Sequence, residues 1–280
     1  MDLGDSDRVR SVVERVRPEG VFHLGAQSMP SRSWADPVAT YRTNIFGTIH
    51  LYEALRAYPP SGGVVFASSC SAYGEQSGTP ISEDAPLRPV NPYGVSKAAG
   101  DMISHQYSRD FGLRIVRARL FSTTGPGKQG DAPNDFARQL ASAEREGREL
   151  PLRVGNLRAE RDFSDVRDVV RALRLLLDRG EADQAVNVGS GHSRAIRTVL
   201  ETLVRAARVP VRIETDPDLL RPADERSLVA DVRRLRSLGF APEIPLEVTL
   251  TDALEFWRHR IAEAPPAAER TVRPESRVGS

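Results

Sequence analysis

Cysteine is nearly absent from this sequence, in which Cys70 is the only one among 280 residues. A single thiol excludes an internal disulfide framework and is typical of a protein that works in the reducing cytoplasm. No apolar run approaches the length of a membrane span, and residues 1–5 lack the basic region followed by an apolar stretch that marks a signal peptide. We therefore predict a cytoplasmic protein without a membrane partner.

An excess of charge of either sign is also lacking. Lys plus Arg total 39 and Asp plus Glu total 38, which leaves a net charge of +1. Proteins that bind nucleic acid usually carry a basic excess, so we expect no nucleic-acid partner. Nothing in the sequence gives a reason to expect a metal site.

Apolar segments alternate with helical patterns over much of the chain. The expected strands are residues 21–25, 64–67, 114–118 and 185–188, and the expected helices are residues 38–58, 93–110 and 166–178. Strands separated by single helices predict an α/β fold with a parallel, doubly wound, Rossmann-like sheet and right-handed crossovers.

Two regions interrupt this alternation, residues 120–165 and 191–262. They contain short expected strands and glycine- and proline-rich turns, and they end in an expected helix over 246–262. We expect them to form a small C-terminal substrate lobe, interleaved with a core made of residues 1–119 and 166–190. Residues 263–280 are rich in Pro, Ala, Glu and Arg, which predicts a disordered tail.

A tyrosine and a lysine four residues apart form the strongest chemical signal, in Tyr93-Gly-Val-Ser-Lys97. On a helix these two side chains share a face. A nearby ammonium group lowers the pKa of a tyrosine, which would make Tyr93 a general acid/base for interconverting a carbinol and a ketone. The alternative is an ordinary surface pair, because the motif alone is weak.

A serine at the end of an upstream strand strengthens the catalytic interpretation. Residues 64–69, Val-Val-Phe-Ala-Ser-Ser, place the Ser69 hydroxyl at the carboxyl edge of a parallel sheet, where ligands bind. Ser69 can then hydrogen-bond the same substrate oxygen as Tyr93. The alternative is a serine that only caps the following turn.

The set of Ser69, Tyr93 and Lys97 resembles the catalytic set of the extended short-chain dehydrogenases/reductases. Three more segments resemble motifs of that family: residues 2–5 (Asp-Leu-Gly-Asp), 23–28 (His-Leu-Gly-Ala-Gln-Ser) and 44–48 (Asn-Ile-Phe-Gly-Thr). The resemblance implies NAD(P) as cofactor and a homodimer paired through helices 38–58 and 93–110. The implied cofactor contacts are Asp2, Leu3, His23, Gly25, Ala26, Gln27 and Asn44, although each also has an ordinary structural explanation.

The downstream half is similar to enzymes of GDP-mannose metabolism, through residues 154–168 and Arg221-Pro-Ala-Asp224. The resemblance implies a nucleoside-diphosphate sugar as substrate, with GDP favoured. Arg161 and Arg221 would bind the diphosphate, which suits the guanidinium fork, and Asp224 would bind the ribose. The other implied substrate contacts are Ser28, Ser71, Ser122 and Asn156. Ordinary surface salt bridges are the alternative for the charged residues.

Two positions depart from the family pattern. The 4,6-dehydratases have an acid where this chain has Ser71, which argues against dehydratase chemistry, and Ser122 stands where family members usually have Asn. The closest resemblance is to the GDP-4-keto-6-deoxy-mannose reductases, with Tyr93 as the acid and Lys97 and Ser69 assisting. An epimerase acting on a nucleotide sugar, or a degenerate non-catalytic binding protein, are the alternatives.

No Gly-x-Gly-x-x-Gly or Gly-x-x-Gly-x-x-Gly occurs in the chain. In the family that loop binds the cofactor pyrophosphate at a helix N-terminus. We therefore expect the sequence to open at the end of the family's third strand, without on the order of 50 residues, and we expect weak NAD(P) binding. A misassigned start, a second chain that covers the missing face, or a degenerate relative would each explain this.

Overall fold

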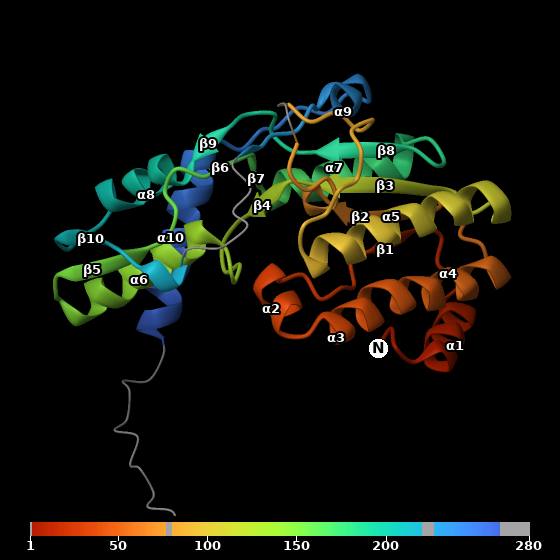
Figure 1. Ribbon diagram of the computed structural model, residues 1–280, viewed down its shortest axis with the longest axis horizontal. Helices are drawn as coiled ribbons and strands as arrows, with labels where there is room; N and C mark the ends of the chain where they lie inside the picture. The colour runs from red at the N-terminus through yellow and green to blue at the C-terminus, as the bar shows by residue number, and fades with distance from the viewer. Residues whose placement is uncertain (1, 77–79, 220–226, 264–280) are drawn as a thin grey trace, which may run out of the picture.

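The computed structural model describes residues 2–76, 80–219 and 227–263. Its main sheet has four strands, all parallel, in the spatial order β1-β2-β3-β8 (Figure 1). They are β1 (Val21–His23), β2 (Val64–Ser69), β3 (Ile115–Leu120) and β8 (Ala185–Val188). The prediction of a parallel α/β fold is confirmed, with each of these strands in an apolar segment expected to form one.

Helices cover both faces of this sheet. The helices of one face are α1 (Ser6–Val16), α4 (Gly47–Ala57) and α5 (Pro92–Phe111), which pack with Val64, Phe66 and Ile115 in one apolar cluster. The opposite face carries α7 (Val166–Arg179), which packs on Val65 and Val116. Neighbouring residues of β2 thus enter different cores, because successive side chains of a strand point to opposite faces.

The expected helix over residues 38–58 is divided into three parts. It begins as α3 (Pro37–Tyr41), widens into the π-helical turn η1 (Arg42–Phe46), and continues as α4. The short helix α2 (Pro30–Ala35) precedes it. Asn44 lies on the π-helical turn and is buried, and such turns occur often at functional sites.

A second apolar core lies beside the sheet, on the left in Figure 1. Its helices are α6 (Ala132–Glu146), α8 (Ile196–Arg205) and α10 (Leu246–Ala262), and its strands are the parallel pair β5 (Leu150–Val154) and β10 (Val211–Thr215). Shorter elements join the two cores: β4 (Ser122–Thr124), β6 (Glu160–Arg161), β7 (Phe163–Asp165), β9 (Arg194–Ala195), β11 (Ser227–Leu228), α9 (Arg233–Ser237) and the turns η2 (Cys70–Ala72) and η3 (Pro217–Leu219).

Three buried carboxylates fasten this second core to the sheet. Asp162 accepts hydrogen bonds from Ser190 N, Ser190 Oγ, Gly191 N and Ala230 N at 2.7, 2.6, 2.9 and 3.0 Å. Asp165 caps α7 and also accepts from Thr249 Oγ1 of α10 at 2.8 Å. Asp168 accepts from the backbone N–H groups that follow α9, at residues 243 and 244. These three aspartates therefore stabilise the packing of the second core against the sheet.

Strand β1 forms an edge of the sheet. It has a neighbour on one side only, and Phe22 and the following Leu24 are 41% and 56% exposed. Apolar side chains are therefore exposed along this edge. Among the described residues no helix is long and apolar enough to cross a membrane. The expected tail lies outside them from residue 264 onward.

Candidate active site

Ser69 and Tyr93 meet at the carboxyl end of β2. Ser69 is the last residue of that strand, and its Oγ accepts a hydrogen bond from Ser71 N at 3.2 Å, so that it caps the turn η2. Tyr93 lies in the first turn of α5, which begins at Pro92 with Asn91 as its N-cap. Asn91 and Pro92 are typical of a helix start. A hydrogen bond joins the side chains of Ser69 and Tyr93.

Lys97 lies one turn farther along α5, on the same face as Tyr93. Its Nζ donates a hydrogen bond to Ala67 O at 2.8 Å and lies 5.9 Å from the centre of the Tyr93 ring. Burial lowers the pKa of Lys97 to about 8. The main chain of β2 thus holds the ammonium group in place through one of its three N–H donors.

The pKa of Tyr93 moves in the direction opposite to the prediction. Burial raises it to about 12, and the hydrogen bond from Ser69 only partly offsets this. The expected lowering by Lys97 is therefore wrong, because removing a phenolate from water costs more than the surrounding groups return. At neutral pH the phenol therefore holds its proton, as an ordinary tyrosine does, and can offer it to an oxygen placed beside it.

Residues 24–28 form a loop at the carboxyl end of β1, and Asn44 holds its main chain. Asn44 Oδ1 accepts from Gln27 N at 2.7 Å, and Asn44 Nδ2 donates to Gln27 O at 3.0 Å and to Ser96 Oγ at 2.8 Å. Gln27 Nε2 donates to Thr40 Oγ1 at 3.1 Å. Gly25, Ala26, Gln27 and Ser28 are partly or fully exposed, so the loop lies at the surface of the protein.

The turn at Asp2 and Leu3 packs beside this loop. Asp2 Oδ1 accepts from Gly4 N at 2.9 Å, and His50 Nδ1 bonds Leu3 O at 2.8 Å. A Cβ atom at Gly25 would lie 2.8 Å from Leu3 Cδ1, so the glycine permits the close approach. The structure therefore brings these two sets of predicted cofactor contacts together.

His23 takes no part in that exposed surface. It is buried between Tyr52 and Phe66, and its Nε2 forms a hydrogen bond with Thr48 Oγ1 at 2.9 Å. Burial, followed by the charge of Lys97, lowers its pKa to about 4, so the ring is neutral at physiological pH. These contacts favour the ordinary structural explanation for this residue.

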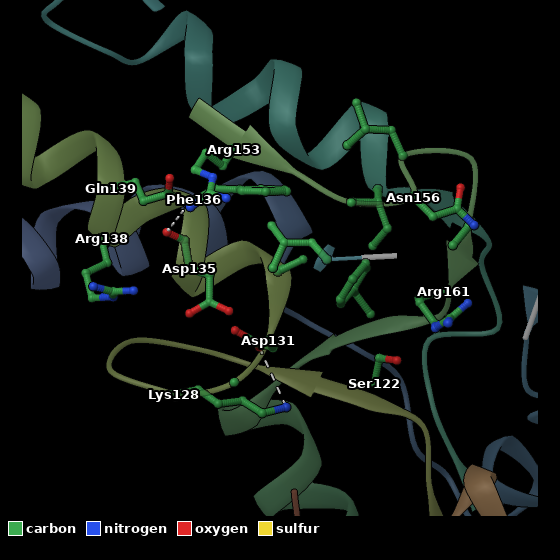
Figure 2. A pocket seen from close by; sticks show the side chains of 18 of the residues that line it. Ser122, Lys128, Asp131, Asp135, Phe136, Arg138, Gln139, Arg153, Asn156 and Arg161 are labelled. Atoms are coloured by element: carbon green, nitrogen blue, oxygen red, sulfur yellow. Dashed lines mark hydrogen bonds and ion pairs between the residues drawn. The ribbon is translucent and has the colours of Figure 1, made fainter. Parts of the chain in front are cut away.

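A pocket of about 470 Å³ lies between α6, β5 and the strands that follow β3 (Figure 2). Of the predicted substrate contacts, Ser122, Asn156 and Arg161 line it. Ser69 and Tyr93 do not line it, but in the sheet register Ser69 pairs with Leu120, two residues before Ser122. Apolar side chains such as Phe136 and Leu157 complete its wall.

Three cationic side chains that line this pocket were not predicted: Lys128, Arg138 and Arg153. Arg153 pairs with Asp216 at 2.6 Å yet is 63% exposed. The alternation of β5, in which Leu150, Leu152 and Val154 are buried, could have revealed it, because Arg153 must point away from the core.

The remaining predicted contacts do not line this pocket. Ser71 lies on η2 behind Ser69, and Ser28 lies on the loop after β1. Arg221 and Asp224 fall within residues 220–226, outside the described part of the chain. No group of His, Cys, Asp and Glu suited to a metal ion occurs among the described residues.

Comparison with known proteins identifies similar sequences over most of the chain. A model of the family described as GDP-mannose 4,6 dehydratase matches residues 1–253. GDP-6-deoxy-D-mannose reductase from Pseudomonas aeruginosa is 36% identical over 250 residues, which are 88% of this chain and 82% of the relative. UDP-glucose 4-epimerase from Rhizobium meliloti is 30% identical over 276 residues, with 92% and 83% covered.

Solved structures share the fold. RMD from Pseudomonas aeruginosa complexed with NADPH superposes with a TM-score of 0.85 at 34% identity, covering 92% of this chain and 87% of that chain. UDP-glucose 4-epimerase from Thermus thermophilus in complex with NAD gives a TM-score of 0.81 at 28% identity, with 92% and 83% covered. The Rossmann-like fold predicted from the sequence is thereby confirmed.

Proposed function

This chain belongs to the GDP-mannose 4,6-dehydratase family of extended short-chain dehydrogenases/reductases, and we propose that it reduces the keto group of a nucleoside-diphosphate 4-keto sugar. The observation that supports this most strongly is the arrangement at the carboxyl end of β2, where Tyr93 at the start of α5 meets Ser69 at the end of the strand and Lys97 follows one turn later. A protonated phenol suits a reduction, in which the carbonyl oxygen must receive a proton.

The residues of the site divide the work as follows. The substrate carbonyl oxygen accepts hydrogen bonds from Ser69 and Tyr93, and Tyr93 transfers its proton as negative charge develops there. The Lys97 ammonium, 5.9 Å from the ring, stabilises the phenolate that remains. NAD(P)H would supply the hydride, held by the exposed loop of residues 24–28 whose backbone Asn44 fixes.

The sugar nucleotide would occupy the pocket of about 470 Å³. Its diphosphate suits the cationic side chains there, Arg161, Arg153 and Lys128, because charge-assisted hydrogen bonds to phosphate are strong. Arg221 for the diphosphate and Asp224 for the ribose remain part of the proposal. A GDP-linked sugar is favoured, since the 36% identical relative is a GDP-6-deoxy-D-mannose reductase.

Cofactor binding by these 280 residues should be weaker than sugar-nucleotide binding. They contain no glycine-rich loop of the dinucleotide-binding type, which supplies backbone N–H groups to the pyrophosphate. The proposed sugar-nucleotide pocket, by contrast, is lined by several cationic side chains that can bind a diphosphate.

The proposal includes a homodimer that works in the cytoplasm. Phe46 before α4 and Met102 on α5 are 55% and 65% exposed, on the helices expected to pair. Apolar residues on both sides of a helix are typical of one that is covered twice. Light scattering that gave the mass of a monomer at micromolar concentration would contradict the dimer. The cytoplasm is favoured by the single buried thiol, Cys70.

An epimerase is the second candidate, because UDP-glucose 4-epimerases are among the relatives. An epimerase must first remove a proton from a substrate hydroxyl, whereas a reductase only has to deliver a proton to a carbonyl oxygen. Product analysis separates the candidates. We expect GDP-4-keto-6-deoxy-mannose with NADPH to give the 4-hydroxy sugar, and UDP-glucose to give no UDP-galactose. The reverse pattern would favour the epimerase, and binding without turnover of either would favour a non-catalytic protein.

A further inference from the structure

We propose that Ser33 and Ser96 are positioning residues, which hold the main chain of Tyr93 so that its hydroxyl stays hydrogen-bonded to Ser69. This inference rests on the proposed function, because it takes Tyr93 as the proton donor. Both serines are almost completely buried, one on α2 and the other on α5. Neither touches the reacting atoms in the scheme above.

Ser33 accepts a hydrogen bond from the backbone N–H group of Tyr93. The N–H groups in the first turn of a helix have no partner within that helix. Asn91 Oδ1 accepts from Gly94 N at 2.8 Å, whereas Tyr93 N donates to Ser33 Oγ at 3.1 Å. Ser33 Oγ donates its own hydrogen to Pro30 O at 2.7 Å. The Ser33 hydroxyl hydrogen is therefore used in the bond to Pro30 O, and the Ser33 oxygen acts as the acceptor for Tyr93 N.

Ser96 donates a hydrogen bond to the backbone carbonyl group of Tyr93. Ser96 Oγ donates to Tyr93 O at 2.7 Å and accepts from Asn44 Nδ2 at 2.8 Å. Asn44 in turn holds the backbone N and O of Gln27. A continuous path of hydrogen bonds therefore joins the loop of residues 24–28 to the carbonyl of Tyr93.

Both polar groups of the Tyr93 main chain are thus held by buried hydroxyls. Ser33 connects Tyr93 to α2, which follows the exposed loop of residues 24–28. Ser96 connects Tyr93 to the loop itself through Asn44. Proton donation requires the phenol in a narrow range of positions, since a misplacement of about 1 Å can cost on the order of 10²-fold in rate. The two serines make that position depend on the loop that would hold the cofactor.

The test compares Ser33→Ala and Ser96→Ala with a matched control, Ser104→Ala. Ser104 is also buried on α5, and its Oγ donates to Gly100 O at 2.6 Å and bonds Tyr52 Oη at 2.7 Å. The control thus loses one bond to a carbonyl and one to a side chain, far from Tyr93. We expect the first two variants to lower kcat by about tenfold or more with little change in KM, and the control to change neither.

A second measurement does not depend on turnover. Tyrosine labelled with ¹³C at Cζ gives one NMR signal for each of the six tyrosines, and Tyr93→Phe identifies that of Tyr93. Ser33→Ala and Ser96→Ala should shift this signal, because the hydrogen bond to Ser69 changes, while Ser104→Ala should leave it in place. Ser33→Cys and Ser96→Cys, which keep the side-chain volume, replace any alanine variant that does not fold.

An unchanged Tyr93 signal and an unchanged kcat in both test variants would overturn the inference. So would equal effects in Ser104→Ala, because these would show a general loss of packing. If the unaltered protein turns over no nucleotide sugar, the proposed function fails, and the NMR comparison alone then decides the positioning role.

Discussion

Replacing Asp162 by alanine should destabilise the protein severely. The carboxylate is fully buried and accepts four hydrogen bonds, three of them from the backbone N–H groups of residues 190, 191 and 230. A buried donor without a partner costs about 1–3 kcal/mol, so three would cost about 3–9 kcal/mol if the costs added fully. Water entering the space left by the carboxylate offsets part of this, and we expect a loss of about 3–5 kcal/mol.

Urea denaturation followed by tryptophan fluorescence and circular dichroism measures this loss. Asp178→Ala is the control, because Asp178 is half exposed on α7 and pairs with Arg174 at the surface, and exposed pairs contribute only about 0–1 kcal/mol. Asp162→Asn should fall between them, since one oxygen remains to accept while the new amide N–H₂ faces donors. A loss below about 1 kcal/mol for Asp162→Ala would show that these hydrogen bonds do not stabilise the fold.

Three further predictions concern charge and ligands. Lys97→Met should stabilise the protein at neutral pH by about 2–3 kcal/mol, because it removes a charge that is costly to bury. This gain in stability should shrink as the pH rises from about 8 to 10.5, because in that range the folded protein has lost the Lys97 proton while the unfolded chain still binds it. Thermal melts across that range measure the change. Arg153→Ala and Arg161→Ala should each weaken GDP-mannose binding about 10-fold or more in calorimetry, whereas Arg174→Ala on the exposed face of α7 should not. The same calorimetry should give a lower Kd for GDP-mannose than for NADPH, and tight NADPH binding without a response to GDP-mannose would reverse the ligand assignment.

Local sequence patterns were sufficient for the strands of the sheet and for the pair Ser69 and Tyr93. Strands β2, β3 and β8 are short apolar runs, and a serine at a strand end or a tyrosine at a helix start keeps its place whatever packs around it. Helix α6 was missed although Asp131 caps it, because the surrounding glycines and prolines suggested only turns. The π-helical turn could not be predicted, since it uses residues that suit an α-helix equally well.

The electrostatics of the site depended on contacts that no sequence pattern contains. The pKa of Tyr93 is raised because the folded chain buries the phenol, and Lys97 turns to Ala67 O, a backbone atom on another element. Arg153 forms an ion pair with Asp216, which follows β10 far along the chain. Such effects arise from tertiary packing, so the residues could be predicted while their protonation states could not.

The oxidation of NADPH in the presence of GDP-4-keto-6-deoxy-mannose tests whether this protein is a reductase. We expect the purified protein to consume NADPH only when the keto sugar is present, and we expect the rate to fall as the pH rises above about 8 and Lys97 loses its charge. Tyr93→Phe should lower kcat by about 10²–10⁴-fold, as expected for loss of a general acid. A Tyr93→Phe variant that reduces the sugar at the rate of the unaltered protein would show that Tyr93 is not the proton donor.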